Sequence, residues 1–230
     1  MRILRNGSRG HDVEYMQRLL VRADVRDRVE SPFYGSDGIF GPQTEQAVRA
    51  LQRRRPGLTV DGVVGPRTWT ALGLRDHREH PIRRYGQPTG MTCWSAAATM
   101  ILGSNMSVGP GGASLGSDGG LRPSIENVAA FGQSLGWQMP NSTPTVPALV
   151  GMLMRTPLWL GVQHSTGRHA VVLSGVYSDG DASGAGTMVR IHDPWPVGQG
   201  AVYTTFVNPL ILRNGPVRYA ASLELLLVPR

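Results

Sequence analysis

The spacing of hydrophobic residues changes along the chain, from helical in the first third to strand-like in the last third. Up to residue 74, apolar residues recur three and four positions apart in three short segments. This is the spacing of one face of an α-helix. The segments begin near Asp12, Pro42 and Pro66, and they predict a small all-α bundle of three helices over residues 1–74.

From residue 85 onward, the pattern predicts helices first and strands afterwards. Helical patterns lie at 93–102, 124–135 and 146–154. Runs rich in β-branched residues, which are typical of strands, lie at 158–162, 169–177, 187–193, 201–207 and 222–228. Helices followed by an antiparallel sheet are typical of the α+β fold class, which we expect for the chain and for residues 85–230 in particular.

An internal repeat marks the N-terminal segment. The sequence Asp-Gly-Ile-Phe-Gly-Pro-Gln-Thr at 37–44 recurs as Asp-Gly-Val-Val-Gly-Pro-Arg-Thr at 61–68. In each copy, a turn at Asp-Gly precedes a proline at the first helical position, where its missing N–H costs no hydrogen bond. We expect these turns to hold the bundle together and a ligand groove to lie elsewhere on it.

Positive charge is concentrated before residue 85. All 23 basic residues are arginine, the chain has 16 acidic residues, and its net charge is +7. Residues 1–84 hold 16 arginines and 10 acids, a balance of +6, and the charged stretch 75–84 is predicted as a linker between two domains. An anionic polymer would suit this charge. Nucleic acid is not expected as a partner, because the sequence has no nucleic-acid-binding motif and few aromatic residues.

The single cysteine of the chain, Cys93, stands at the predicted start of the helix 93–102. Thr92 is the expected N-cap residue. The unpaired amides and the dipole of a helix N-terminus favour the thiolate form of a cysteine. A small buried core residue is the alternative interpretation. A nucleophilic thiol needs a base, and the base needs an orienting group.

The strands predicted at 169–177 and 187–193 form a hairpin. Antiparallel pairing about its turn sets His169 opposite Asp193 on one face of the sheet, whereas alternation sends His192 to the other face. His169 and Asp193 are therefore the candidate base and orienting acid. A surface histidine and a turn aspartate are the alternative.

Gln87 lies in the turn six residues before Cys93. If this turn folds back over the start of the helix, the side-chain amide of Gln87 and the backbone N–H of Cys93 can stabilise an oxyanion together. An ordinary turn glutamine is the alternative. The chemistry requires neither a cofactor nor a metal. His77 and His80 lack further ligands nearby in the sequence, so we expect them to be solvated linker residues.

The order Gln, Cys-Trp, Gly-Arg-His and Asp-Pro-Trp, at residues 87, 93–94, 167–169 and 193–195, resembles papain-like cysteine peptidases, closest to the C39-like and C70-like families. The resemblance covers roughly residues 85–230 and implies a papain-like fold. It also implies four roles: oxyanion donor for Gln87, nucleophile for Cys93, general base for His169 and orienting acid for Asp193. The chain departs from papain in the segment before the cysteine and in having an acid where papain has an amide.

The segment Leu-Arg-Asn-Gly-Ser-Arg-Gly at 4–10, followed in order by the two repeated turns, closely resembles the peptidoglycan-binding module that is often fused to bacterial cell-wall hydrolases. The resemblance covers residues 1 to about 74. It implies that this segment binds murein and takes no part in catalysis.

Together the two resemblances imply a papain-like cysteine hydrolase that is directed to the cell wall and cleaves an amide bond through an acyl-enzyme. Two alternatives stay open. One is a protein-directed cysteine protease, secreted or injected as an effector, whose murein-binding module only aids localisation. The other is a wall-binding protein without catalysis.

Expected partners are peptidoglycan and a peptide or protein substrate, and an immunity or inhibitor protein is a further candidate. The sequence shows neither a signal-peptide pattern nor a long apolar run. We therefore expect no membrane partner. The protein should act at the cell wall, in the periplasm or outside the cell, which it would reach by injection, lysis or another non-classical route.

Overall fold

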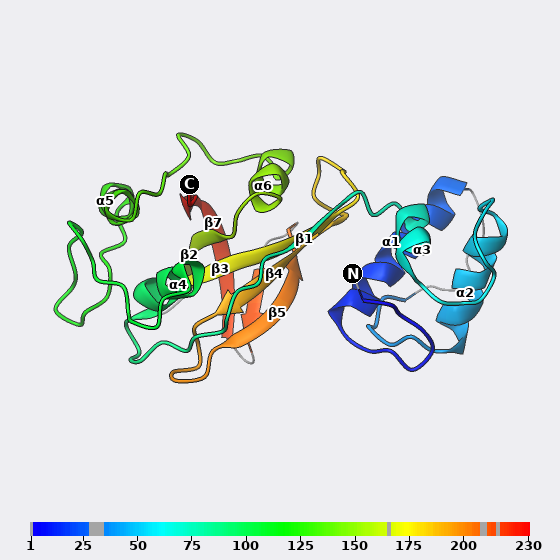
Figure 1. Ribbon diagram of the computed structural model, residues 1–230, viewed down its shortest axis with the longest axis horizontal. Coiled ribbons are helices and arrows are strands. Elements are labelled where there is room, and N and C mark those ends of the chain that lie inside the picture. Colours follow the sequence, from blue (N-terminus) through cyan, green and yellow to red (C-terminus); the bar gives the residue numbers. More distant parts are fainter. Residues whose placement is uncertain (1, 28–34, 165–166, 208–210, 215–216) are drawn as a thin grey trace. The chain divides into compact units, whose positions relative to one another are not determined.

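The computed structural model describes residues 2–27, 35–164, 167–207, 211–214 and 217–230. The chain divides into two compact units (Figure 1). Unit 1 holds residues 1–77 with 177–180, and unit 2 holds residues 78–176 with 181–230. Within the described ranges, no helix combines the length and the hydropathy needed to cross a membrane.

Unit 1 contains the three predicted helices: α1 (His11–Asp27), α2 (Pro42–Arg53) and α3 (Pro66–Leu72). Pro42 and Pro66 stand in the first helical turn, as the repeat predicted. The buried face of helix α1 continues through Ala23. Trp69 stacks on Tyr15 at a centroid distance of 6.2 Å. Fully buried side chains around them form the core: Leu4, Val13, Met16, Leu20, Val48 and Leu51.

Each repeated turn is held by a buried glutamine from the preceding helix. In α1, Gln17 Nε2 donates to Asp37 Oδ1 at 3.0 Å, and its Oε1 accepts from the N–H of Gly38 at 2.9 Å. In α2, Gln52 makes the same two bonds to Asp61 and Gly62, both at 2.9 Å. The repeated motif is therefore structural: it fastens each turn to the helix before it, as the sequence predicted.

We expect Gln52→Leu to lower the free energy of unfolding of unit 1 by about 2 kcal/mol, because buried turn groups would lose their partners. Gln43→Leu is the matched control, since Gln43 is exposed on the same helix. Urea unfolding of both full-length variants, followed by the fluorescence of the tryptophans, measures the difference. Equal stabilities for the two variants would contradict the role given to Gln52.

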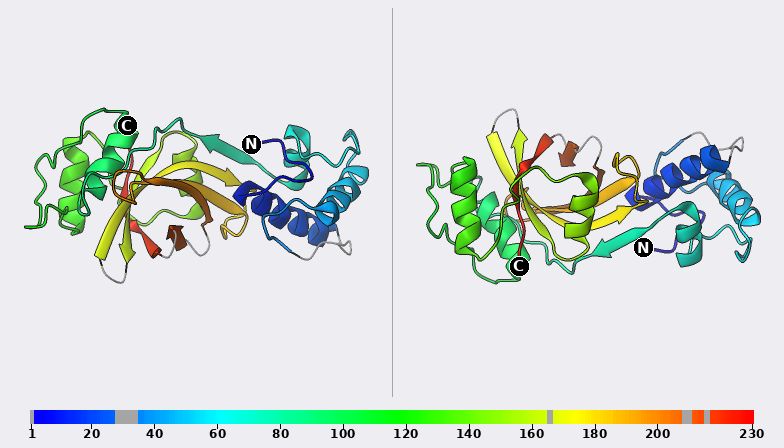
Figure 2. Two further views of the ribbon diagram at one scale, coloured as in Figure 1. Left: turned by 90° about the horizontal axis from the view of Figure 1, so that it is seen from below. Right: turned by 90° about the horizontal axis from the view of Figure 1, so that it is seen from above.

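Unit 2 has the expected α+β order (Figure 2). Its helices are α4 (Cys93–Leu102), α5 (Ile125–Ser134) and α6 (Val146–Leu153). The strands after them are β2 (Leu158–His164), β3 (Gly167–Ser178), β4 (Thr187–Asp193), β5 (Ala201–Phe206), β6 (Ile211–Asn214) and β7 (Val217–Leu227). Strand β6 was not predicted. Among the described residues the sheet order is β5-β4-β3-β2-β7-β6, so β3 and β4 are neighbours as the hairpin prediction required.

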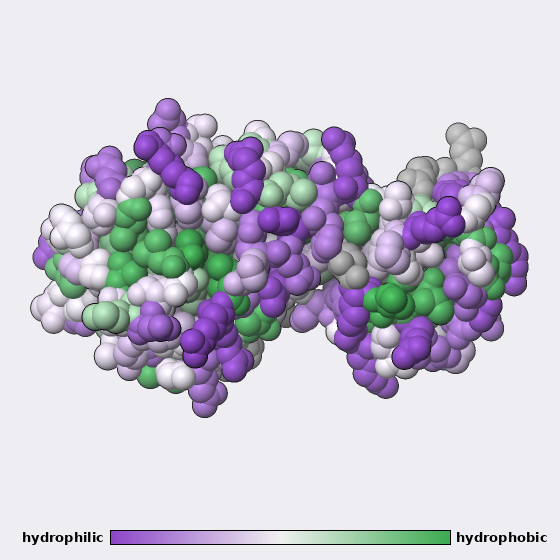
Figure 3. All heavy atoms as spheres, in the orientation of Figure 1, coloured by the Kyte–Doolittle hydropathy of each residue, from purple (hydrophilic) through white to green (hydrophobic). Residues whose placement is uncertain are grey.

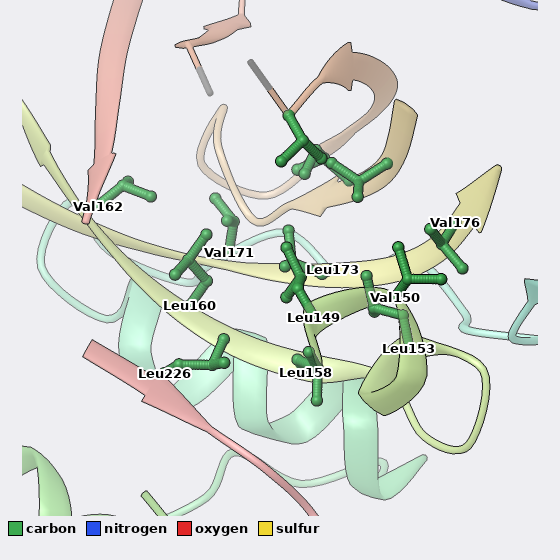
Figure 4. Packing of buried hydrophobic residues seen from close by; sticks show 13 residues of the cluster. Leu149, Val150, Leu153, Leu158, Leu160, Val162, Val171, Leu173, Val176 and Leu226 are labelled. Atoms are coloured by element: carbon green, nitrogen blue, oxygen red, sulfur yellow. The ribbon is translucent and has the colours of Figure 1, made fainter. Parts of the chain in front are cut away.

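Two hydrophobic clusters cover the two faces of this sheet, because successive residues of a strand point to opposite sides. Val171 and Leu173 pack in one cluster with α6, where Figure 4 shows Leu149 and Leu153 next to β2 and β3. Ala170 and Val172 pack in the other cluster with α4 and α5. The helix that begins at Cys93 is therefore fixed against the strand that carries His169.

The predicted linker at 75–84 is not wholly irregular. Residues Asp76–Glu79 form strand β1, which pairs with β3. Strand pairing uses backbone groups, so a charged sequence with exposed side chains can form an edge strand. The prediction that His80 is solvated is wrong: it is buried, and its Nε2 lies 2.7 Å from the carbonyl oxygen of Leu153.

Candidate active site

Helix α4 begins at Cys93 and ends before Gly103, whose left-handed backbone forms the C-cap. Thr92 occupies the N-cap position as predicted, but its side chain makes no cap hydrogen bond. Its hydroxyl donates to the carbonyl of Thr89 at 3.2 Å instead and stabilises the turn before the helix. The Cys93 side chain lies among buried residues of the cluster on this face, and the residue is only 9% exposed.

The β3–β4 hairpin brings His169 and Asp193 together. His169 Nε2 lies 2.6 Å from Asp193 Oδ1, and the two side chains are 8% and 0% exposed. Asp193 also accepts hydrogen bonds from the N–H of Trp195 at 2.8 Å and from the hydroxyl of Tyr203 at 3.1 Å. A buried carboxylate with three donors is held in one orientation.

The His169 ring forms hydrogen bonds with two side chains, those of Asp193 and Cys93. The pKa of His169 is raised from 6.5 to about 9. Burial alone would lower this pKa, but hydrogen bonds with Asp193 and Cys93, and the negative charges of both groups, raise it. An imidazolium between a sulfur and a carboxylate is the arrangement that sustains a thiolate nucleophile near neutral pH.

Cys93 and His169 line one pocket of about 380 Å³. Its wall is largely apolar and includes Trp94, Leu121 and Trp159. On the face drawn in Figure 3, apolar residues gather near α4 and are bordered by polar ones. The size and the apolar lining suit one or two side chains of a peptide substrate.

The glycine-rich stretch 103–120 contributes Gly116, Asp118 and Gly120 to the pocket. The loop is attached to α4 at two points. Trp94 Nε1 donates to the carbonyl of Gly119 at 3.2 Å, and the N–H of Val108 donates to Thr99 Oγ1 at 3.1 Å. The loop therefore forms one wall of the pocket.

Gln87 is fully buried and tied to the segment that follows Asp193. Its N–H donates to the carbonyl of Pro194, and its carbonyl accepts from Gly198, both at 2.9 Å. The neighbouring Gly86 must be glycine, because a Cβ there would lie 2.3 Å from the backbone nitrogen of Gln199. These contacts fix the turn before Cys93 to the loop that follows Asp193.

The side-chain amide of Gln87 is oriented by Thr89. Nε2 donates to the carbonyl of Thr89 at 2.7 Å, and Oε1 is buried without a hydrogen-bond partner among the described residues. An amide nitrogen has two N–H groups, so one is left for another acceptor. Gln87 does not line the pocket with Cys93 and His169, and its role as an oxyanion donor stays a prediction.

His192 points to the opposite face of the sheet, as alternation predicted. It is buried, and its Nδ1 lies 2.8 Å from the hydroxyl of Ser174. Its pKa is lowered from 6.5 to about 4, first by burial and then by the charges of Arg190 and Arg84, against a hydrogen bond with Ile82. His192 is therefore neutral in the folded chain at pH 7.

We expect His192 to destabilise the fold in acid. As the pH falls from 6.5 towards 4, the unfolded chain binds a proton that the folded chain does not, so stability is full above about 6.5 and is lost below it. The loss should reach about 3 kcal/mol. Urea unfolding of His192→Asn at pH 6.5 and 4.5 should show a smaller drop than the wild type. The exposed His11→Asn is the control, and a drop as large as that of the wild type in His192→Asn would contradict this assignment.

Three residues near the site were given no role from the sequence. Tyr203 lies on β5 opposite Ile191, and only the strand register shows that it reaches Asp193. Arg122 and Arg168 both line the pocket. Arg168 was quoted only as part of the Gly-Arg-His motif, whereas Arg122 comes from an irregular stretch without periodicity.

Two families match the chain. The family described as a putative peptidoglycan binding domain matches residues 9–72, and the family described as papain-like cysteine protease AvrRpt2 matches residues 76–208. The order of the two domains agrees with the predicted fusion.

The chain is also similar to two curated proteins of Bacillus licheniformis. One is the N-acetylmuramoyl-L-alanine amidase CwlL, 41% identical over 70 residues, which are 30% of this chain and 18% of the amidase. The other is a probable N-acetylmuramoyl-L-alanine amidase, 40% identical over 74 residues, which are 32% of this chain and 20% of that protein. The chain thus spans about a fifth of the length of these relatives.

The match over residues 76–208 covers more than half of the 230 residues. It contains the strand that carries His169, the helix that begins at Cys93 and the strand that ends at Asp193. The chain belongs to the papain-like cysteine protease AvrRpt2 family and carries a putative peptidoglycan binding domain before it.

Proposed function

We propose that this chain is a cell-wall hydrolase that cleaves an amide bond in the stem peptides of peptidoglycan. Residues 1–74 would bind murein, and residues 85–230 would carry out catalysis. One observation carries the proposal: a buried Asp193–His169 pair adjoins Cys93 in a pocket, in a chain that also has a peptidoglycan-binding domain.

In the proposed reaction, the Cys93 thiolate attacks the carbonyl carbon of the scissile amide. His169 gives its proton to the leaving nitrogen, the C–N bond breaks, and a thioester with the acyl part of the substrate remains. His169 then takes a proton from water, whose oxygen attacks the thioester and releases a carboxylic acid and the thiolate. Asp193 holds the imidazole throughout, and the N–H groups of Cys93 and Gln87 stabilise the oxyanion.

The peptidoglycan-binding domain explains how such an enzyme would find its substrate. A tethered catalytic domain meets wall peptides at an effective concentration that reaches the millimolar range. The excess positive charge of residues 1–84 would add attraction to anionic wall polymers.

A digestion experiment tests the choice of substrate. Purified murein and an unfolded protein are incubated separately with the enzyme, and newly released amines are quantified. We expect new amines from murein. Release from the protein alone would favour the second candidate, a protein-directed protease that uses the module for localisation, which the protease description of the family supports.

A further inference from the structure

Arg122 and Arg168 stand where two hollows of unit 2 meet. Both residues line the pocket of Cys93 and His169, and together with Pro123 they also line a neighbouring groove. The groove continues over polar side chains that include Ser124 and Asn127. A peptide that extends from the pocket into the groove must therefore pass two guanidinium groups.

Both guanidinium groups have N–H groups beyond those in their hydrogen bonds with the described residues, and these can donate to a ligand. Arg168 Nη1 donates to the carbonyl of Pro123 at 2.6 Å, and Arg122 Nε donates to that of Leu115 at 3.3 Å. A guanidinium has five N–H groups, so these bonds orient each side chain without exhausting it. Within the described part of the chain, neither arginine forms an ion pair with a carboxylate.

Two acidic residues, Asp118 and Glu126, lie near this junction, one in each hollow. Asp118 lines the pocket, and its Oδ1 accepts from the N–H of Gly120 at 3.0 Å, which stabilises the loop turn. Glu126 lines only the neighbouring groove. Arg168 and His169 line the same pocket, so a carboxylate bound by Arg168 would lie in the pocket that holds the scissile bond.

We propose that Arg122 and Arg168 select substrates that carry a free carboxylate next to the scissile amide, with an apolar or small neighbour in the pocket. Paired N–H donors of arginine match the two oxygens of a carboxylate. This inference rests on the proposed hydrolase function and specifies its substrate. Both the stem peptides of murein and acidic segments of proteins carry free carboxylates close to amide bonds.

The test compares substrates that differ only in charge. One set contains soluble peptides with Glu or Asp and their Gln or Asn counterparts; the other contains murein fragments with free or amidated stem-peptide carboxylates. We expect the wild type to cleave the charged member of a set at least about 10-fold faster in kcat/KM. If the enzyme prefers the charged member only among the murein fragments, the recognised carboxylate belongs to murein. If it does so only among the soluble peptides, the recognised carboxylate belongs to protein substrates.

Arg122→Gln and Arg168→Gln should each reduce this preference by about 10-fold or more, and Arg168→Glu should reverse it. Arg155→Gln is the matched control, because Arg155 is exposed and lines neither hollow. Arg→Lys variants, which keep the charge, should retain part of the preference even if the Gln variants fold poorly.

Two results would overturn the inference while leaving the proposed function in place. One is equal cleavage of charged and amidated substrates by the wild type, and the other is an unchanged preference in both Gln variants. If the wild type cleaves no member of either set, both the inference and the proposed hydrolysis fail.

Discussion

Replacing Cys93 with alanine should abolish hydrolysis and leave folding and murein binding intact. The variant lacks the only thiol of the chain, and removing a covalent nucleophile costs on the order of 10⁴-fold or more in kcat. The fold should survive, because the change removes one sulfur from a side chain that packs beside Ala97 and Ala98. Amine release measures activity, sedimentation with murein measures binding, and circular dichroism measures folding.

Leu102→Ala is the control for this experiment, since Leu102 is about half exposed at the other end of α4. It should keep the wild-type rate. If Cys93→Ala hydrolyses substrate at the wild-type rate, the proposed mechanism with Cys93 as the nucleophile is wrong. A wild-type chain that binds murein and releases no amines from any substrate would instead favour the third possibility, a wall-binding protein without catalysis.

Asp193→Asn should lower kcat by about 10²- to 10⁴-fold and shift the pH profile. The bond to Asp193 and its charge help to raise the pKa of His169 to about 9. In the wild type the imidazolium should therefore persist up to about pH 9, and activity should be lost as the pH rises through that value. Without the carboxylate the pKa of His169 falls, so the alkaline limit of activity should move to lower pH.

The pH profile of kcat/KM between pH 5 and 10 measures this shift. Asp181→Asn is the control, because Asp181 is a carboxylate of the same hairpin whose Oδ1 accepts from the N–H of Ser183. Its alkaline limit should match that of the wild type. An unchanged limit in Asp193→Asn, together with near wild-type activity, would show that Asp193 does not orient the base.

The pairing of His169 with Asp193 could be predicted because strand geometry allows few alternatives. Side chains alternate with a period of two, so fixing the turn of one hairpin decided which residues share a face. The same reasoning correctly sent His192 to the other face. The helical bundle of unit 1 could also be predicted from the sequence, since its turns and helix starts depend on local residue patterns that repeat in the sequence.

Other features depend on contacts that no local pattern encodes. The strand Asp76–Glu79 has charged side chains, and its pairing with β3 involves only the backbone. Tyr203 reaches Asp193 through the register of two strands, which a single sequence does not specify. Arg122 comes to the pocket from a stretch without periodicity.

The central claim, that His169 and Asp193 activate Cys93, is tested most directly by labelling with a peptide-based thiol electrophile at pH 7, followed by peptide mapping. Since Cys93 is the single cysteine, the modified site is unambiguous. We expect rapid labelling of Cys93 in the wild type and a reduction of about 100-fold or more in His169→Ala. Equal labelling rates in the two proteins would show that the thiol acts without the imidazole and would contradict the account.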